Sequence, residues 1–177
     1  MVILMADDTT IFIIEKFTML TDFVEDRIRM NLVNAHGTTI AIWLTRRLLD
    51  RFLPVMIKHV EARASPSMPI KLSLSLSQLK LRQDRQQNPC QPVSQPLGTM
   101  PWLGTTMRLF TQENGAVWAL IGDAGQEARI FLTDTNVRAA LDIIHNNYAQ
   151  MEWGREHFPE WIVDAVQPKA PGNFVLH

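Results

Sequence analysis

The chain has 177 residues, the length of one domain, and its 46% hydrophobic and 20% charged residues allow a buried core and exclude a disordered or collagen-like protein. The formal net charge of −1 lacks the basic excess of a dedicated nucleic-acid-binding protein. A single cysteine, Cys90, excludes an intramolecular disulfide and a cysteine-rich zinc module. We therefore expect one domain over residues 1–177.

The first five residues are apolar, but Asp7 and Asp8 follow closely and no basic segment precedes them. This pattern predicts no signal peptide, and Met1 and Met5 are both open as starts. Apolar runs stay shorter than the 18 residues that a membrane helix needs. We expect a cytoplasmic protein without a membrane segment.

A strand is expected over residues 10–20, and an internal repeat follows it. A shift of 88 residues aligns residues 30–60 with residues 118–148 without a gap and matches six identical positions. The aligned segments also share conservative apolar pairs. This similarity predicts two copies of one unit.

Each copy is expected to fold as a β-hairpin followed by a helix. In the first copy, residues 28–32 alternate apolar and polar side chains, which is typical of a strand with one solvated face. Gly37 and Gly125 lie in four-residue loops where a positive φ closes the turn. The return strands are expected over residues 38–44 and 126–132.

Thr45 and Thr133 lie where the apolar period changes from 2 to 3.6, so both are predicted to be helix N-caps. An apolar stripe follows each of them, which predicts a helix packed on its own hairpin. Pro54 falls inside the first helix and predicts a kink there or a break into two short helices.

Between the copies, residues 69–77 alternate cleanly and are predicted to form a further strand. Residues 82–101 hold five Gln and four Pro, a composition typical of a mobile linker, with an ordered extended loop over the sheet as the alternative. A strand is expected over residues 105–112. Residues 151–166 are expected to cap the sheet, with Pro159 starting a short helix.

The predicted fold class is α+β. We expect a mostly antiparallel sheet built from two pseudo-symmetric hairpin-plus-helix units, with the helices on one face. Repeat unit one spans about residues 10–81, the linker about 82–101 and repeat unit two about 102–166. Two small lobes joined by the linker are the alternative.

An anion site is the first candidate function. Arg46 and Arg47 follow the Thr45 cap, where the helix dipole disfavours cations, and Arg51 lies one turn on from Arg47. Free first-turn amides and guanidinium groups could bind a phosphate, a carboxylate or nucleic acid. The alternative is that these arginines are solvated or paired with acids such as Asp50 or Asp134.

An acidic run is the second candidate, because a histidine flanked by carboxylates can act as a general base or metal ligand. Glu152, Glu156, His157 and Glu160 make up this run, but it lacks the spacing of a metalloprotease motif. His145 matches an apolar position of the repeat and is expected to be a core histidine bonded to a backbone carbonyl. We expect no cofactor and no metal, and an enzyme is the less favoured class.

The uneven charge of the two halves suggests association. Residues 1–90 carry twelve Lys and Arg and nine Asp and Glu, whereas residues 91–177 carry five and nine. Opposite charges of this kind hold two units together or steer two chains into a dimer. The favoured hypothesis is a non-catalytic interaction protein, a homodimer or a binder of another protein, that uses exposed sheet and the side chains of Trp153, Phe158 and Trp161.

Overall fold

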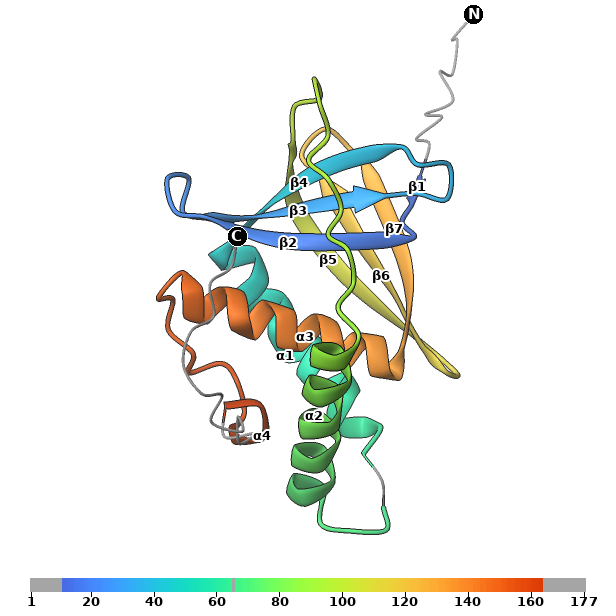
Figure 1. Cartoon of the computed structure of the whole chain (residues 1–177), viewed down its shortest axis with the longest axis vertical. Coiled ribbons are helices and arrows are strands. Elements are labelled where there is room, and N and C mark those ends of the chain that lie inside the picture. Colours follow the sequence, from blue (N-terminus) through green and yellow to red (C-terminus); the bar gives the residue numbers. More distant parts are fainter. Residues whose placement is uncertain (1–10, 65, 164–177) are drawn as a thin grey trace, which may run out of the picture.

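A mixed seven-stranded sheet with four helices makes up the described part of the chain, residues 11–64 and 66–163 of the computed structural model (Figure 1). The sheet order is β1-β7-β6-β5-β4-β3-β2. In chain order the elements are β1 (Phe12–Ile13), β2 (Lys16–Asp22), β3 (Arg27–Val33), β4 (Thr39–Thr45), α1 (Arg46–Ala62), α2 (Ile70–Gln87), β5 (Trp102–Gln112), β6 (Gly115–Gly122), β7 (Glu127–Thr133), α3 (Asp134–Gln150) and α4 (Glu160–Val163).

The α+β class is confirmed, but the sheet is mixed and the prediction of a mostly antiparallel sheet was wrong. β4 pairs with β5 in parallel, with Ile42 opposite Trp102, and β1 pairs with β7 in parallel, with Phe12 opposite Ala128. Between β4 and β5 the chain forms α1 and α2, and this long connection lets β5 run parallel to β4. β1, which precedes β2, runs parallel to β7 at the edge of the sheet.

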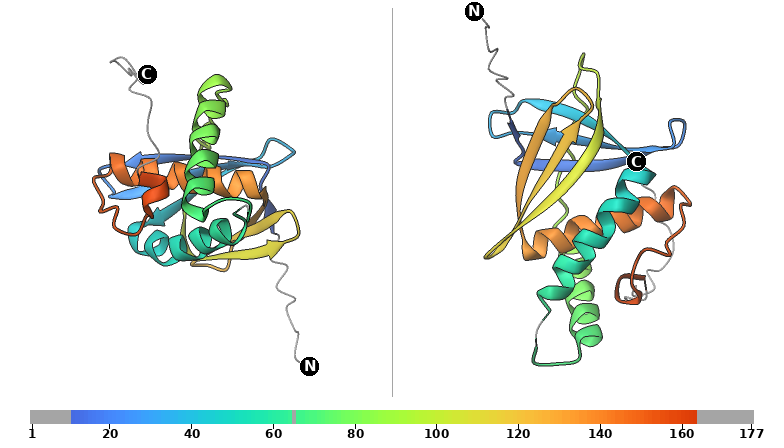
Figure 2. Two further views of the ribbon diagram at one scale, coloured as in Figure 1. Left: turned by 90° about the horizontal axis from the view of Figure 1, so that it is seen from below. Right: turned by 180° about the vertical axis from the view of Figure 1, so that it is seen from behind.

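The chain passes from one edge of the sheet to the other between β1 and β2. The amide of Ile14 donates to the carbonyl of Arg129 on β7, and the next amide, that of Glu15, donates to the carbonyl of Val33 on β3. The sheet is thus strongly twisted, and α1 and α3 lie against its inner side (Figures 1 and 2).

Trp118 of β6 occupies the centre of the core and is fully buried. Its ring stacks on Phe52 of α1 at 5.5 Å between centroids and meets Phe17 of β2 edge-on at 5.7 Å. One cluster of buried apolar side chains contains residues of both halves of the chain. Stacked and edge-to-face rings of this kind add to the stabilisation given by burial alone.

Both predicted helix caps are confirmed. The Thr45 hydroxyl accepts a hydrogen bond from the Leu48 amide, and the Thr133 hydroxyl accepts one from the Asn136 amide, each at 3.2 Å. The helix that begins after Thr45 continues through Pro54 to Ala62, so the alternative of two short helices was wrong.

The two predicted turn glycines also adopt the expected conformation. Gly37 has φ +79° and Gly125 has φ +80°. Side chains other than glycine are strained in this left-handed region, which explains the residue choice in both hairpins. In the hairpin of β3 and β4, Arg27 lies opposite Thr45, and in that of β6 and β7, Gly115 lies opposite Thr133.

The predicted strand over residues 69–77 was wrong, because this segment begins α2. The alternation of leucine and serine has the two-residue period of a strand, but in a helix the same residues form two apolar stripes on opposite sides. Leu74 and Leu81 are buried on one side, and Leu72 and Leu76 are half exposed on the other. Leucine, lysine and glutamine all favour a helix, whereas strands prefer β-branched residues.

The segment predicted as a linker, residues 82–101, ends α2 and then crosses the outer face of the sheet without regular structure (Figure 1). Val93 is buried there. Its amide donates to the Thr18 hydroxyl at 2.8 Å, and its carbonyl accepts from the Asn31 amide side chain at 3.3 Å. Residues 88–101 therefore have the arrangement of the alternative, an extended loop over β2 and β3.

The segment after α3 covers helices rather than the sheet. Trp153 and Phe158 each pack edge-on against Tyr148 of α3, and the indole of Trp161 donates to Glu61 of α1. α4 begins directly after Pro159, as expected. The rest of the predicted cap, from residue 164 on, and the predicted features of residues 1–10 lie outside the described residues. Across the described residues, no helix has the length and apolar character of a membrane span.

Candidate functional site

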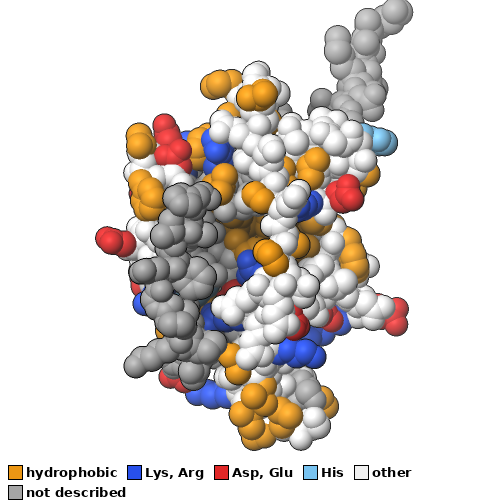
Figure 3. All heavy atoms as spheres, viewed as in Figure 1, with side chains coloured by type: hydrophobic (Ala, Val, Ile, Leu, Met, Phe, Trp, Pro, Cys, Tyr) orange, Lys and Arg blue, Asp and Glu red, His pale blue; other side chains and the backbone are white. Residues whose placement is uncertain are grey.

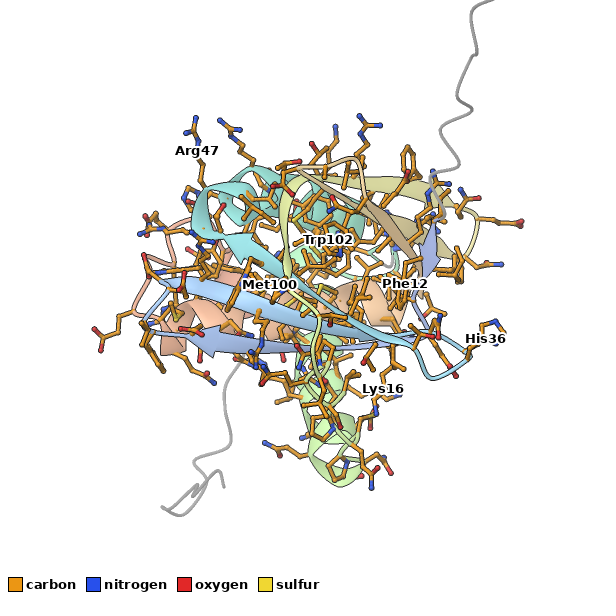
Figure 4. The ribbon with its side chains drawn as sticks, turned by 90° about the horizontal axis from the view of Figure 1, so that it is seen from above. Phe12, Lys16, His36, Arg47, Met100 and Trp102 are labelled. Carbon is orange, nitrogen blue, oxygen red and sulfur yellow. The ribbon has the colours of Figure 1, made fainter. Side chains whose placement is uncertain are left out.

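The arginines at the start of α1 do not converge on an empty anion site. Arg46 lies 3.6 Å from Asp50 and 3.8 Å from Glu156, measured between side-chain nitrogen and oxygen. Arg47 and Arg51 are exposed, and Arg47 points away from the body of the molecule (Figure 4). These positions fit the alternative, because Arg46 pairs with acids and the side chains of Arg47 and Arg51 are solvated.

Two residues of the acidic run lie next to Arg46 and Asp50. His157 lies 3.8 Å from Asp50, and Glu156 faces Arg46. Glu160 faces Lys71 at 3.2 Å on the surface, and Glu152 has a positive φ of 54° in the turn after α3. No group of three metal-ligating side chains occurs among the described residues.

Asp50 of α1 joins this helix to α3 through Tyr148. The phenol donates a hydrogen bond to Asp50 at 2.8 Å, and the ring is fully buried. Burial first, and then the hydrogen bond and charge of Asp50, raise the pKa of Tyr148 far above its usual value. The phenol stays protonated, so this cluster serves as a joint between α1 and α3.

The aromatic side chains predicted to form an interface are buried inside the chain. Trp153, Phe158 and Trp161 are 5–6% exposed. They pack on Tyr148 and Arg138 of α3, whose guanidinium lies 5.6 Å from the ring of Trp161. Because these rings complete the core of one chain, the hypothesis of an interface through them loses its basis.

Sequence reasoning missed a polar cluster in a cleft of about 360 Å³ between α1, α2 and the start of α3. The ring of His59 lies between Asp134, 3.0 Å from its Nε2, and the hydroxyl of Thr111, 3.3 Å from its Nδ1. Arg63 takes the other oxygen of Asp134 at 3.2 Å and also donates to the carbonyl of Glu113 at 2.7 Å.

The order hydroxyl, imidazole, carboxylate is that of a hydrolase triad, but this arrangement ties elements together. Here Nδ1 faces the hydroxyl and Nε2 faces the carboxylate, the reverse of a hydrolase triad, and the His59 side chain is 4% exposed. Arg63 neutralises the carboxylate of Asp134. The cluster thus holds the end of α1 to β5 and to α3. Its sequence signal was the polar residue His59 on the apolar stripe of α1.

His145 is buried as expected, but the expected bond to a backbone carbonyl is absent. Within the described part of the chain, neither ring nitrogen has a hydrogen-bond partner. The ring packs edge-on against Phe158 at 4.9 Å. Burial lowers the pKa of His145, the charge of Arg82 lowers it further, and the charge of Asp142 opposes part of this shift.

The outer side of α2 carries apolar side chains that the described part of the chain leaves exposed. We call it the α2 outer face. Its leucines are Leu72 and Leu76, 51% and 50% exposed, and the half-buried Leu79 one turn on. Met68, 39% exposed, lies just before α2, and Ile70, 58% exposed, lies one turn before Leu74 and so on the other side of the helix. α2 stands out from the layer of α1 and α3 (Figure 2), and hydrophobic side chains gather at the end of the molecule where it begins (Figure 3).

The charges on α2 lie away from this face or at its margin. Arg82 and Arg85 turn inward to the buried Asp142, at 2.9 and 3.0 Å. Gln83, Gln86 and Gln87 continue the exposed side after the leucines. The α2 outer face is therefore a stripe of leucine and glutamine.

Comparison of the chain with protein-family models, with curated proteins and with solved structures finds no match.

Proposed function

We propose that this chain is a non-catalytic interaction protein that forms a homodimer through the α2 outer face. The observation that carries the proposal is that α2 is apolar on two opposite sides. Leu74 is 1% exposed on the inner side, whereas Leu72 and Leu76 leave half of their surface in water. One side is used within the chain, and the other is available for a second helix.

A second copy fits this face because the face has leucine and glutamine and almost no charge. A twofold axis near the middle of the stripe sets two α2 helices antiparallel, with Leu76 of one copy against Leu79 of the other. Leu72 then lies against Gln83. A surface without a strong charge of its own is self-complementary, whereas a charged partner finds no opposite charge here.

The size of the face fits a dimer of moderate affinity. Leu72 and Leu76, each about half exposed, and the half-buried Leu79 present roughly 250 Å² of apolar surface per copy, near the lower end of functional surface patches. With the neighbouring glutamines, the total approaches the lower end of stable interfaces, about 1,200 Å² for both partners. The dimer should therefore depend on concentration in the micromolar range.

Light scattering and sedimentation across a range of concentrations test the proposal. The wild-type chain should reach twice the monomer mass of 20.2 kDa. The double variant Leu72→Lys plus Leu76→Lys should stay monomeric with an unchanged circular dichroism spectrum. Val24→Lys is the matched control, because Val24 is an apolar side chain 95% exposed on a distant turn. A wild-type monomer at all concentrations, or a dimer that survives the double variant, would refute the α2 interface.

We also propose that the two halves of the fold arose by internal duplication. Three features recur at a spacing of 88 residues: the turn glycines, the threonine caps, and the strand positions that lie opposite those caps. Ion pairs cross between the halves, as between Arg63 and Asp134 and between Arg82 and Asp142. Superposition of residues 30–60 on 118–148 tests this: the hairpin and helix should coincide, and a different helix direction would contradict it.

A cytoplasmic location is part of the proposal. Cys90 is an exposed free thiol, which stays reduced in the cytoplasm and is oxidised in secretory compartments. No anion site built on Arg46 is proposed, because Arg46 already faces Asp50 and Glu156. No metal site built on His157 is proposed, because the described residues contain no group of three metal-ligating side chains.

A further inference from the structure

The outer side of β5, β6 and β7 is open, in contrast to that of β2 and β3. Residues 88–101 cross the outer side of β2 and β3 (Figure 1), whereas no described segment crosses the other half when it is seen from behind (Figure 2). Two phenylalanines lie in the open half: Phe110 is 45% exposed and Phe131 is 54% exposed. Exposed aromatic side chains on a sheet face indicate a binding surface.

The register of the strands places these rings in one row. Phe110 lies opposite Val117, and Val117 lies opposite Phe131. Arg108 and Arg129 lie two residues from these phenylalanines on the same strands, so they form the next row on the same side of the sheet. Each aromatic ring therefore has a guanidinium beside it on its own strand, about 7 Å further along.

α1 adds three cations on the same side of the molecule. Arg47, Arg51 and Lys58 are exposed and share one face of the helix. α1 packs against β5, and the helix and the open strands lie side by side in the view from behind (Figure 2). Arg47 points to the side where β5, β6 and β7 also lie (Figure 4).

This surface carries a positive charge although the formal net charge of the whole chain is −1. Of its five cations, Arg129 pairs with Glu127 at 2.6 Å, and the other four have no ion pair within the described residues. The acids of α1, Asp50 and Glu61, lie on the adjoining side of the helix and accept bonds from aromatic side chains of α3 and α4.

We propose that this combined surface of α1 and β5–β7 binds single-stranded nucleic acid. Phosphates contact Arg47, Arg51, Lys58 and Arg108, and bases stack on the rings of Phe110 and Phe131. Aromatic platforms beside a line of cations suit unpaired bases, because a duplex keeps its bases stacked and out of reach of a sheet. A second copy is disfavoured at this surface by repulsion between like charges, so the site is separate from the α2 outer face.

Fluorescence anisotropy with a labelled twenty-nucleotide oligo-dT strand, and with an RNA strand of the same length, tests the proposal. We expect micromolar binding at 50 mM salt that weakens steeply at 200 mM. Four phosphate contacts give a slope of about −3 for log affinity against log salt concentration. A duplex of the same length should bind more weakly.

Matched variants separate the two parts of the surface. Arg47→Ala plus Arg51→Ala should reduce the salt slope by about 1.4, and Phe110→Ala should reduce affinity roughly tenfold for one lost stack. Phe110→Tyr should bind as the wild type does. Lys71→Ala is the control, because it removes an exposed cation on α2.

Three results would overturn the proposal. The first is no binding of either strand at 50 mM salt and 100 μM protein. The second is an unchanged affinity in the arginine and Phe110→Ala variants, with melting temperatures showing that they are folded. The third is equal competition by an acidic peptide, which would show a surface that attracts any polyanion without stacking bases.

Discussion

Removal of the Asp142 carboxylate should strongly destabilise the contact between α2 and α3. Asp142 is 2% exposed. One of its oxygens accepts from Gln78 and Arg82 at 2.9 Å, and the other accepts from Arg85 at 3.0 Å. In Asp142→Ala all three donors lose this acceptor, and two of them are cations. Deletion of one partner of a buried ion pair costs about 3–5 kcal/mol.

The exposures of the two arginine side chains narrow the expected loss of stability. The side chain of Arg85 is 42% exposed, so its pair contributes at most about 1 kcal/mol. The side chain of Arg82 is 14% exposed and that of Gln78 is buried, so most of the loss arises from these two. We expect the free energy of unfolding to fall by about 3–4 kcal/mol, which lowers the melting temperature by about 10 °C in a domain of this size.

Urea unfolding followed by tryptophan fluorescence measures the change. Glu160→Ala is the control: it also deletes a carboxylate that faces a cation, but Lys71 and Glu160 are 84% and 76% exposed, so no measurable change is expected. A loss below about 1 kcal/mol in Asp142→Ala would refute the reasoning. The apolar contacts of α2 would then hold it in place without the charged cluster.

Three further predictions concern stability. The folded pKa of His145 is lowered, so the unfolded chain binds more protons as the pH falls below about 6.5, and the free energy of unfolding should decrease from pH 7 to pH 5. Urea unfolding of His145→Leu should show a weaker decrease with pH. Equal decreases in the variant and the wild type would contradict this. Leu74→Ala should lower the free energy of unfolding by about 2–5 kcal/mol, because Leu74 is 1% exposed. Leu76→Ala should change the stability of the monomer little, because Leu76 is 50% exposed. Similar losses of stability in thermal unfolding of the two variants would argue against an α2 with one buried and one exposed apolar side. Thr133→Ala removes the cap of α3 and should cost about 1 kcal/mol in chemical unfolding, and Thr133→Ser should retain most of that stability.

The hairpins and helix starts were predictable because neighbouring residues decide them. Gly37 closes its turn and Thr45 accepts the first-turn amide of α1 through contacts within four residues. The alternation of Ile28 with its neighbours placed one side of β3 in the core for the same reason. Such local preferences act before any distant part of the chain is in place.

The candidate sites were less predictable because their partners are distant in sequence. Arg46 was singled out for its odd position in the first turn, but its partner Glu156 lies 110 residues later. The Asp134 partner of His59 lies 75 residues later, and local sequence offered no sign of it. Burial of Trp161 likewise depends on the approach of α1 and α3.

The sequence by itself determined the units of this protein: two hairpins, their turns, and the helices that begin after Thr45 and Thr133. Only the tertiary structure decided which side of the helix over residues 70–87 is buried, because its leucines form two apolar stripes and one of them packs against the rest of the chain. It also decided which faces stay open. Residues 88–101 cover β2 and β3, while the outer sides of α2 and of β5–β7 remain available for partners.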